Sequence, residues 1–203
     1  RCGEEINLLG EEAVVCHEHK KPSCQGIHNA HFSQGKLQTG FVFSVPGAKE
    51  VEASCPVAGV TGDNMSLALA HLHQRAEAQF PSWDRYDYRI TNAYSKPIAK
   101  SMGDLNSEAQ NSLIKDSENA QRVLCELDGC SLVILCGKKA QLLREEIAAE
   151  SRRVICMSHL SNQALSRKYP SESMHTTSSA RERRKLRAKL WADELLDKLQ
   201  QLR

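Results

Sequence analysis

Two polar side chains with different chemistry each follow a short apolar run of the chain. Asn92 ends the run that starts at Tyr86, and His159 comes two residues after the run that ends at Met157. A side-chain amide presents a donor and an acceptor side by side, and an imidazole can donate a hydrogen bond where negative charge builds. Each residue also has an ordinary explanation, as a turn residue after a strand or as a cap on its end. They are candidates for binding a polar ligand if the fold brings them together.

The elements around these residues alternate between strand and helix. Short runs rich in apolar, aromatic or β-branched residues predict strands over 41–45, 86–91, 132–136 and 153–157. Helical spacing predicts helices over 65–80, 104–128, 138–150 and 180–202. This alternation predicts an α/β fold, a three-layer α/β/α sandwich around a central, mostly parallel four-stranded sheet. Functional sites of such sheets gather after the carboxyl ends of the strands, in loops that here begin at Ser44, Asn92, Gly137 and His159.

Length and composition indicate one globular domain over residues 1–203. The chain is 40% hydrophobic and 26% charged, which excludes a chain disordered throughout and a collagen-like repeat. No stretch approaches the roughly 20 apolar residues of a membrane span, and the N-terminal residues lack the order of a secretory signal. We therefore expect a cytoplasmic protein without membrane contact, although the opening Arg1 leaves removal of a leader open. The 8 cysteines are too dilute for a disulfide scaffold, which predicts reduced thiols.

The charge is divided unevenly along the chain. Residues 1–150 hold 15 Lys and Arg against 20 Asp and Glu, whereas residues 151–203 hold 12 against 5. We expect residues 1–35 to be an N-terminal extension, and the Ser/Thr-rich segment 166–180 to be a flexible connection into the last helix. The cations of that helix crowd its first turns, where the helix dipole disfavours them. A polyanionic partner would explain this arrangement, and a solvated charged helix is the alternative.

Five segments in the predicted loops and strand ends form an ordered set of motifs. They are Val45-Pro46-Gly47-Ala48-Lys49-Glu50, Pro56-Val57-Ala58-Gly59-Val60-Thr61-Gly62, Tyr88-Arg89-Ile90-Thr91-Asn92 with Lys96-Pro97, Ile134-Leu135-Cys136-Gly137, and His159-Leu160-Ser161-Asn162. In this order they resemble the motifs of the uracil-DNA glycosylase superfamily, and most closely those of its family four, over residues 38–203. The resemblance implies an enzyme that flips a base out of DNA and hydrolyses its bond to deoxyribose.

The resemblance implies a role for each segment. His159 would donate to the base carbonyl as charge builds on the leaving base, and Asn92 would read the base edge. Val45, Pro46, Gly47 and Val57 would lie against the flipped nucleotide. DNA contacts are predicted at Lys138, Lys139, Leu160, Ser161, Asn162, Arg167, Lys168, Arg183, Arg184 and Arg187, with Leu160 reaching toward the gap left by the base. No lysine stands where it could form an imine with the sugar, so we expect a monofunctional enzyme that leaves an abasic site. We also expect the protein to be a monomer.

The chain also departs from the family pattern. Family four has a glutamate at the place of Ser44, and other branches have Asp or Asn at the place of Val45, so the usual group that positions the water is missing. Our hypothesis is that Glu50 or Asp63, or failing these Glu52, orients the water, while Ser44 could at best hold one. Val57 replaces an aromatic residue that stacks on uracil. A pocket without this ring favours a base bulkier than uracil, such as a modified cytosine of phage DNA.

The cysteines that hold an iron–sulfur cluster in family four are not matched, because Ser95 and Ser117 stand at or near two of their places. We therefore expect no cluster and no other cofactor. A zinc site is the alternative, since thiolates and imidazoles at short spacing suit this metal. Its ligands would be Cys16, His19 and Cys24 with His28 or His31.

Three functions stay open at this point. The first is a DNA glycosylase that acts on a damaged or modified base. The second is a catalytically silent protein that flips and holds a modified base, which the missing acid favours. The third is an unrelated α/β protein that binds a small molecule and has no affinity for DNA.

Overall fold

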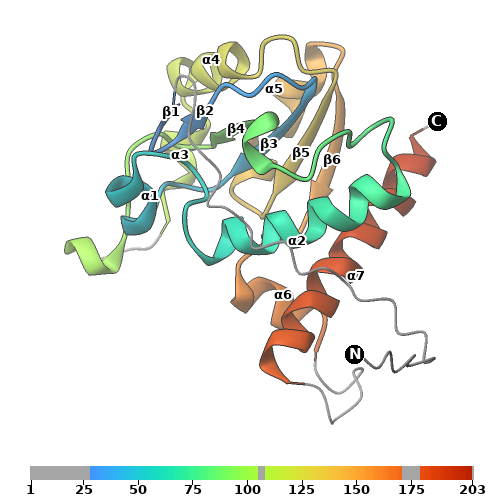
Figure 1. Ribbon diagram of the computed structural model, residues 1–203. Helices are drawn as coiled ribbons and strands as arrows, with labels where there is room; N and C mark the ends of the chain where they lie inside the picture. The colour runs from blue at the N-terminus through green and yellow to red at the C-terminus, as the bar shows by residue number, and fades with distance from the viewer. Residues whose placement is uncertain (1–27, 105–107, 171–178, 203) are drawn as a thin grey trace, which may run out of the picture.

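The computed structural model describes residues 28–104, 108–170 and 179–202 (Figure 1). One sheet has the strand order β1-β2-β4-β3-β5-β6. Its strands are β1 (His28–Asn29), β2 (Phe32–Ser33), β3 (Thr39–Phe43), β4 (Arg89–Asn92), β5 (Leu132–Cys136) and β6 (Arg153–Met157). The last four are parallel, whereas the short β1 and β2 pair antiparallel beside β4. The predicted α/β class is confirmed, and the two short strands add to the expected four.

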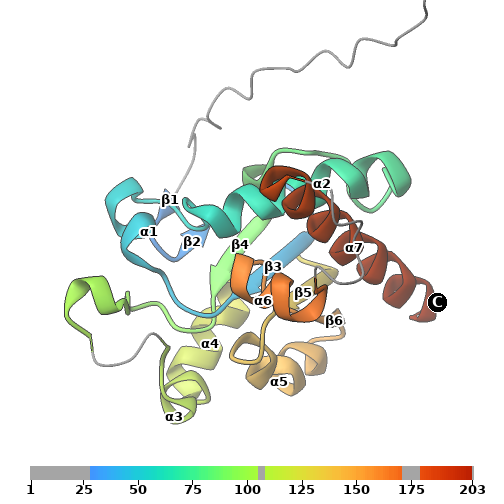
Figure 2. The same cartoon turned by 90° about the horizontal axis from the view of Figure 1, so that it is seen from below.

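Helices cover both faces of this sheet (Figures 1 and 2). The helices are α1 (Ala48–Ala53), α2 (Val60–Arg75), α3 (Asn111–Ile114), α4 (Ser117–Glu126), α5 (Arg144–Ala149), α6 (Asn162–Lys168) and α7 (Ala180–Gln201), with 3-10 turns η1 (Arg85–Asp87), η2 (Lys100–Met102) and η3 (Ala140–Leu143). Phe41 and Phe43 pack with α2, α6 and α7, whereas Val42 packs with α4 and α5 on the opposite face. Because successive side chains of a strand point to opposite faces, the fully buried β3 serves both layers. None of the described helices is long and apolar enough to cross a membrane.

The helix boundaries differ from the sequence prediction at capping residues. The strands at 132–136 and 153–157 and the start of the last helix at 180 are confirmed. Helix α2 begins at Val60 instead of Met65, because Gly59 has the extended backbone of an N-cap and the helix then includes Gly62. The helix expected over 104–128 is divided into α3 and α4. Asp116 separates them, since its Oδ1 accepts hydrogen bonds from the N–H groups of the first turn of α4.

Other predicted segments also change in extent. The helix expected over 138–150 consists of η3 followed by α5, and the connection expected over 166–180 starts later, because α6 continues to Lys168. Residues 171–178 of that connection lie outside the described residues. Of the N-terminal extension 1–35, residues 28–33 form the β1–β2 hairpin, and residues 1–27 are outside the described part.

The strand order reverses its direction between β3 and β5. The chain leaves β3 toward α2 on one face and continues to β4, whereas it leaves β5 toward α5 on the other face and continues to β6. In open α/β sheets, ligands bind beside the carboxyl ends of the strands at such a reversal. Helix α6 lies below the sheet in Figure 1 and in front of it in Figure 2, at this same edge.

Candidate active site

His159 follows β6 and its imidazole reaches toward β3. The Nδ1 atom accepts a hydrogen bond of 3.0 Å from the backbone N–H of Ser161. The proton of the neutral ring is therefore on Nε2, which has no partner in the described part of the chain and is not fully enclosed. The ring packs edge-to-face on Phe43, with 5.6 Å between the centroids. Gly137 makes room for it, since a Cβ there would lie 3.1 Å from the Cβ of His159.

Burial lowers the pKa of His159 from 6.5 to about 4. The imidazole is thus neutral at physiological pH. A neutral imidazole can polarise a carbonyl by donating from one nitrogen, without bringing a full charge into the site. His159 can therefore act as an uncharged donor to a group that gains negative charge.

The loop that carries His159 is held from several elements. The carbonyl of Met157 accepts from the Gln141 side chain at 2.9 Å, and that of Ser158 accepts from Trp191 Nε1 at 2.8 Å. The carbonyl of Leu160 accepts from Asn64 Nδ2 at 2.7 Å. These donors come from η3, α7 and α2, so both layers of the sandwich fix the backbone around His159 before any ligand binds.

Asn92 ends β4 on the same face of the sheet as Phe43. The two residues are register partners in parallel strands, so their side chains project to the same side. The Asn92 side-chain amide has no hydrogen-bond partner among the described residues and is not fully enclosed, although the residue is only 4% exposed. The amide of Asn92 and the ring of His159 thus lie on either side of Phe43. Together they offer an amide donor, an amide acceptor and the Nε2–H of an imidazole beside one aromatic ring.

The loop after β3 is tied to the loop after β4. The carbonyl of Ser44 accepts from the N–H of Tyr94 at 3.1 Å, and the carbonyl of Pro46 accepts from the N–H of Ile98 at 3.1 Å. The side chain of Val45 packs into the apolar layer of α4 and α5, so it is the backbone at Val45 that is left to contact a ligand.

The three candidate carboxylates differ in their surroundings. Glu50 Oε2 accepts from the N–H of Gly47 at 3.0 Å, so this carboxylate stays on the loop after β3. Glu52 pairs with Lys49 in an exposed ion pair. Asp63 is 57% exposed and pairs with Arg184 of α7 at 3.1 Å. Of the three, Glu50 is the one that is bonded to the loop leading away from Phe43.

Val57 has a left-handed backbone, with φ of +48°, which is strained for a β-branched residue. Gly62 accommodates this turn, since a Cβ at Gly62 would lie 1.7 Å from the Val57 carbonyl oxygen. The Val57 side chain is buried in the same apolar cluster as Phe43.

The structure corrects one predicted DNA contact. Leu160 is fully buried in the layer of α2 and α7, so it does not reach toward a gap in the base stack. The motif suggested an exposed leucine, but the loop turns this side chain inward and caps α6 with Ser161, whose Oγ accepts from the N–H of Ala164. Asn162 is exposed, and its Oδ1 accepts a hydrogen bond from Asn64 Nδ2 at 2.9 Å.

The predicted basic contacts fall into three groups. Lys138 and Arg167 are exposed. Lys139 donates to the carbonyl of Ala109 at 2.7 Å, and Lys168 lies 3.5 Å from Glu194, so both ammonium groups have internal partners. Arg183, Arg184 and Arg187 line a hollow of about 400 Å³ between α6 and α7. Arg184 also bonds to Asn64 Oδ1 at 2.6 Å, which links this hollow to the His159 loop.

Potential metal ligands are not gathered in the part of the chain that the structure describes. No group of three or more His, Cys, Asp or Glu residues there could hold a metal ion. The candidate zinc ligands Cys16, His19 and Cys24 lie outside these residues. Of the two further candidates, His28 begins β1 and His31 lies 3.0 Å from Glu126.

No model of a known protein family matches the chain, and no curated protein matches it either.

Several residues around the site have no motif that would have singled them out. Phe43 reads as an ordinary strand residue, yet it is the ring that both candidate groups flank. Asn64 and Arg122 lie within helices and bond to backbone carbonyls of the His159 and Asn92 segments. A buried asparagine inside a helix is the one available signal, because such a side chain needs a partner.

Proposed function

We propose that the protein is a DNA glycosylase of the uracil-DNA glycosylase superfamily that hydrolyses the bond between a flipped base and deoxyribose. The observation that supports this most is the placement of the His159 imidazole and the Asn92 amide on either side of Phe43. A base inserted there would meet a donor and an acceptor along one edge and an uncharged donor at a carbonyl oxygen.

In this proposal the two residues act at different stages. Asn92 binds the edge of the extruded base and so selects it. Moving the base out of the stack costs a few kcal/mol, which contacts in the site must offset. His159 Nε2–H donates to the carbonyl oxygen as negative charge builds there, which stabilises the transition state more than the ground state. The sugar gains cationic character, and water adds to it once the base departs. The product is a free base and an abasic site.

The carboxylate that orients the water is proposed to be Glu50. Its bond to Gly47 keeps it on the loop after β3, whereas Asp63 is bound to Arg184 at the surface. We expect Glu50→Gln to slow base release more than Asp63→Asn does. If Ala at positions 50, 52 and 63, introduced singly, left release unchanged, a carboxylate would have no part in the reaction.

The substrate is proposed to be a base larger than uracil, such as a modified cytosine of phage DNA. The basis is Val57, which offers no ring for stacking on uracil. Release of uracil, with none from DNA carrying modified cytosine, would contradict this part of the proposal.

A catalytically silent reader of modified bases is the second candidate. It is favoured because the carboxylates of Glu50, Glu52 and Asp63, the candidates for orienting the water, are each already bonded to another group of the described residues. The two functions are separated by incubating the protein with DNA that carries diverse modified or damaged bases, followed by alkali. Strand breaks indicate excision, retardation in a gel without breaks indicates reading, and the absence of any salt-dependent binding contradicts both.

A further inference from the structure

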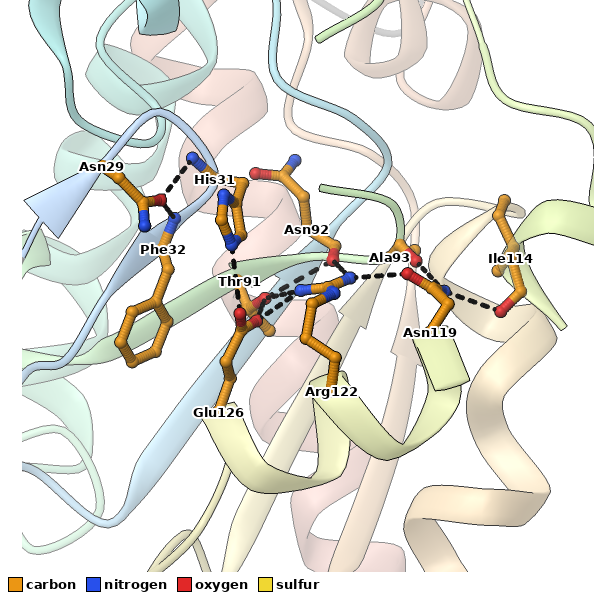
Figure 3. A network of polar contacts seen from close by, with 10 residues as sticks. All are labelled: Asn29, His31, Phe32, Thr91, Asn92, Ala93, Ile114, Asn119, Arg122 and Glu126. Carbon is orange, nitrogen blue, oxygen red and sulfur yellow. Dashed lines mark hydrogen bonds and ion pairs between the residues drawn. The ribbon is translucent and has the colours of Figure 1, made fainter. Parts of the chain in front are cut away.

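A polar cluster on α4 meets the end of β4 from the face opposite to His159 (Figure 3). Arg122 donates from Nη2 to the backbone carbonyl of Asn92 at 2.9 Å and to Asn119 Oδ1 at 2.9 Å. Its Nη1 pairs with Glu126 Oε2 at 2.5 Å. Figure 3 shows the amide of Asn92 on the side of the strand away from this guanidinium. Arg122 therefore holds the backbone that carries the amide and leaves the amide itself open.

The next carbonyl of the strand end is held in the same way. Asn119 Nδ2 donates to the carbonyls of Ala93 and Ile114, each at 2.8 Å. From the side of β3, the N–H of Ala93 donates to the carbonyl of Phe43 at 2.7 Å. Two successive residues at the carboxyl end of β4 are thus fixed by α4 as well as by the neighbouring strand.

Holding the carboxyl end of β4 with a largely buried guanidinium costs folding free energy. The Arg122 side chain is only 23% exposed, and its Nε is fully enclosed without a partner among the described residues. A buried ion pair loses much of its attraction to desolvation, and apolar residues of similar size often stabilise a protein as much or more. Stability alone therefore does not explain a guanidinium at position 122. A role in fixing the position of the Asn92 backbone would explain it.

Glu126 holds the guanidinium in turn. Its carboxylate also accepts from Thr91 Oγ1 at 2.5 Å and lies 3.0 Å from His31 Nε2. We infer that Arg122 is a positioning residue for the base-reading amide of Asn92, with Asn119 and Glu126 fixing its geometry. This inference rests on the proposed function, because it concerns the residue proposed to select the base.

The first test separates positioning from stability by kinetics. Arg122→Met, Arg122→Lys and a control, Arg152→Met, are compared for kcat, KM and preference between two bases. Arg152 suits as a control because it also has an enclosed, unpartnered nitrogen and bonds to α4, at the carbonyl of Leu124, whereas no hydrogen bond joins its side chain to β4 in the described residues. We expect Arg122→Met to lower kcat/KM about a hundredfold, as for a displacement of about 1 Å, and to reduce base preference. Arg122→Lys should recover part of the loss, and Arg152→Met should retain wild-type values.

The second test does not need activity. The side-chain amide signals of Asn92 are followed by NMR in protein labelled with ¹⁵N, and we expect a lower order parameter in Arg122→Met but not in Arg152→Met. If the wild-type protein releases no base, the proposed function fails, and this measurement still decides whether Arg122 orders the amide. If Arg122→Met does not fold, Asn119→Ala removes the bond to Ala93 and takes its place. An unchanged Asn92 amide and unchanged base preference, with only a lower melting temperature, would overturn the inference.

Discussion

The lowered pKa of His159 makes the stability of the protein depend on pH in a defined direction. The folded protein resists protonation of this ring down to a pKa of about 4, whereas the unfolded chain binds a proton at the ordinary value of 6.5. Below pH 6.5 the unfolded state therefore takes up a proton that the folded state does not. The contribution of His159 is fully present above pH 6.5 and is lost as the pH falls toward 4.

The size of this loss follows from the two pKa values. Linkage gives a destabilisation of about 1 kcal/mol at about pH 5.5 and about 2 kcal/mol at about pH 4.5, relative to neutral pH. At both pH values most folded molecules still carry the neutral ring. Base release should therefore not fall through titration of His159 in this range.

The assay compares wild-type protein with His159→Gln by urea unfolding at several pH values. Other groups titrate in both proteins, so the difference between their free energies of unfolding isolates His159. We expect the advantage of wild type over the variant to shrink by the amounts above as the pH falls. The His159 ring signals in NMR give the folded pKa independently.

Equal pH dependence in both proteins would refute the reasoning. It would mean that His159 titrates as in the unfolded chain and is charged in mildly acidic solution. An NMR pKa near 6.5 would have the same consequence, because it would mean that burial does not disfavour the charged ring.

Three further predictions concern the elements around the site. Leu160→Ala should cost about 2–5 kcal/mol in urea unfolding, as for a buried leucine, and leave the DNA affinity of the folded variant unchanged; weaker binding at equal stability would contradict the buried position. Gly137→Ala should destabilise by about 1–3 kcal/mol and slow base release, because φ is +97° and the new Cβ would press on His159; a variant as stable and active as wild type would count against this packing. Lys138→Ala should lower the salt dependence of DNA binding by about one phosphate contact, measured by fluorescence anisotropy, whereas Lys139→Ala should chiefly lower thermal stability because Lys139 bonds to Ala109; the reverse result would show that the two lysines have been assigned the wrong roles.

The alternation of strand and helix was readable because it depends on local patterns. The run 132–136 is continuous, apolar and buried, as a strand covered on both faces must be, and its bounds are confirmed together with those of the edge strand 153–157. Boundaries set by caps were harder to predict. Asp116 lies within a stretch of helical spacing, and only its bonds to Glu118 and Asn119 show that one helix ends and another begins there.

The loop residues of the candidate site could be predicted from the sequence, but the residues that hold these loops in place could not. Asn92 and His159 stand at strand ends, so the order of elements placed them at one edge of the sheet. Which side chains turn inward depends on tertiary packing, and this is why Leu160 was assigned to DNA contact although it lies in the core. Arg122 meets Asn92 across 30 residues of sequence, a separation that no local pattern reveals.

The most direct test of the central claim is a double-mutant cycle on base release. Free base from modified and damaged DNA is measured by mass spectrometry for wild type, Asn92→Ala, His159→Gln and the double variant. If the two side chains bind the same base, each single change should slow base release about a hundredfold or more. The fold-reduction in the double variant should then be clearly smaller than the product of the two single fold-reductions. Losses that multiply fully would show that Asn92 and His159 act independently, and single variants as active as wild type would contradict the site altogether.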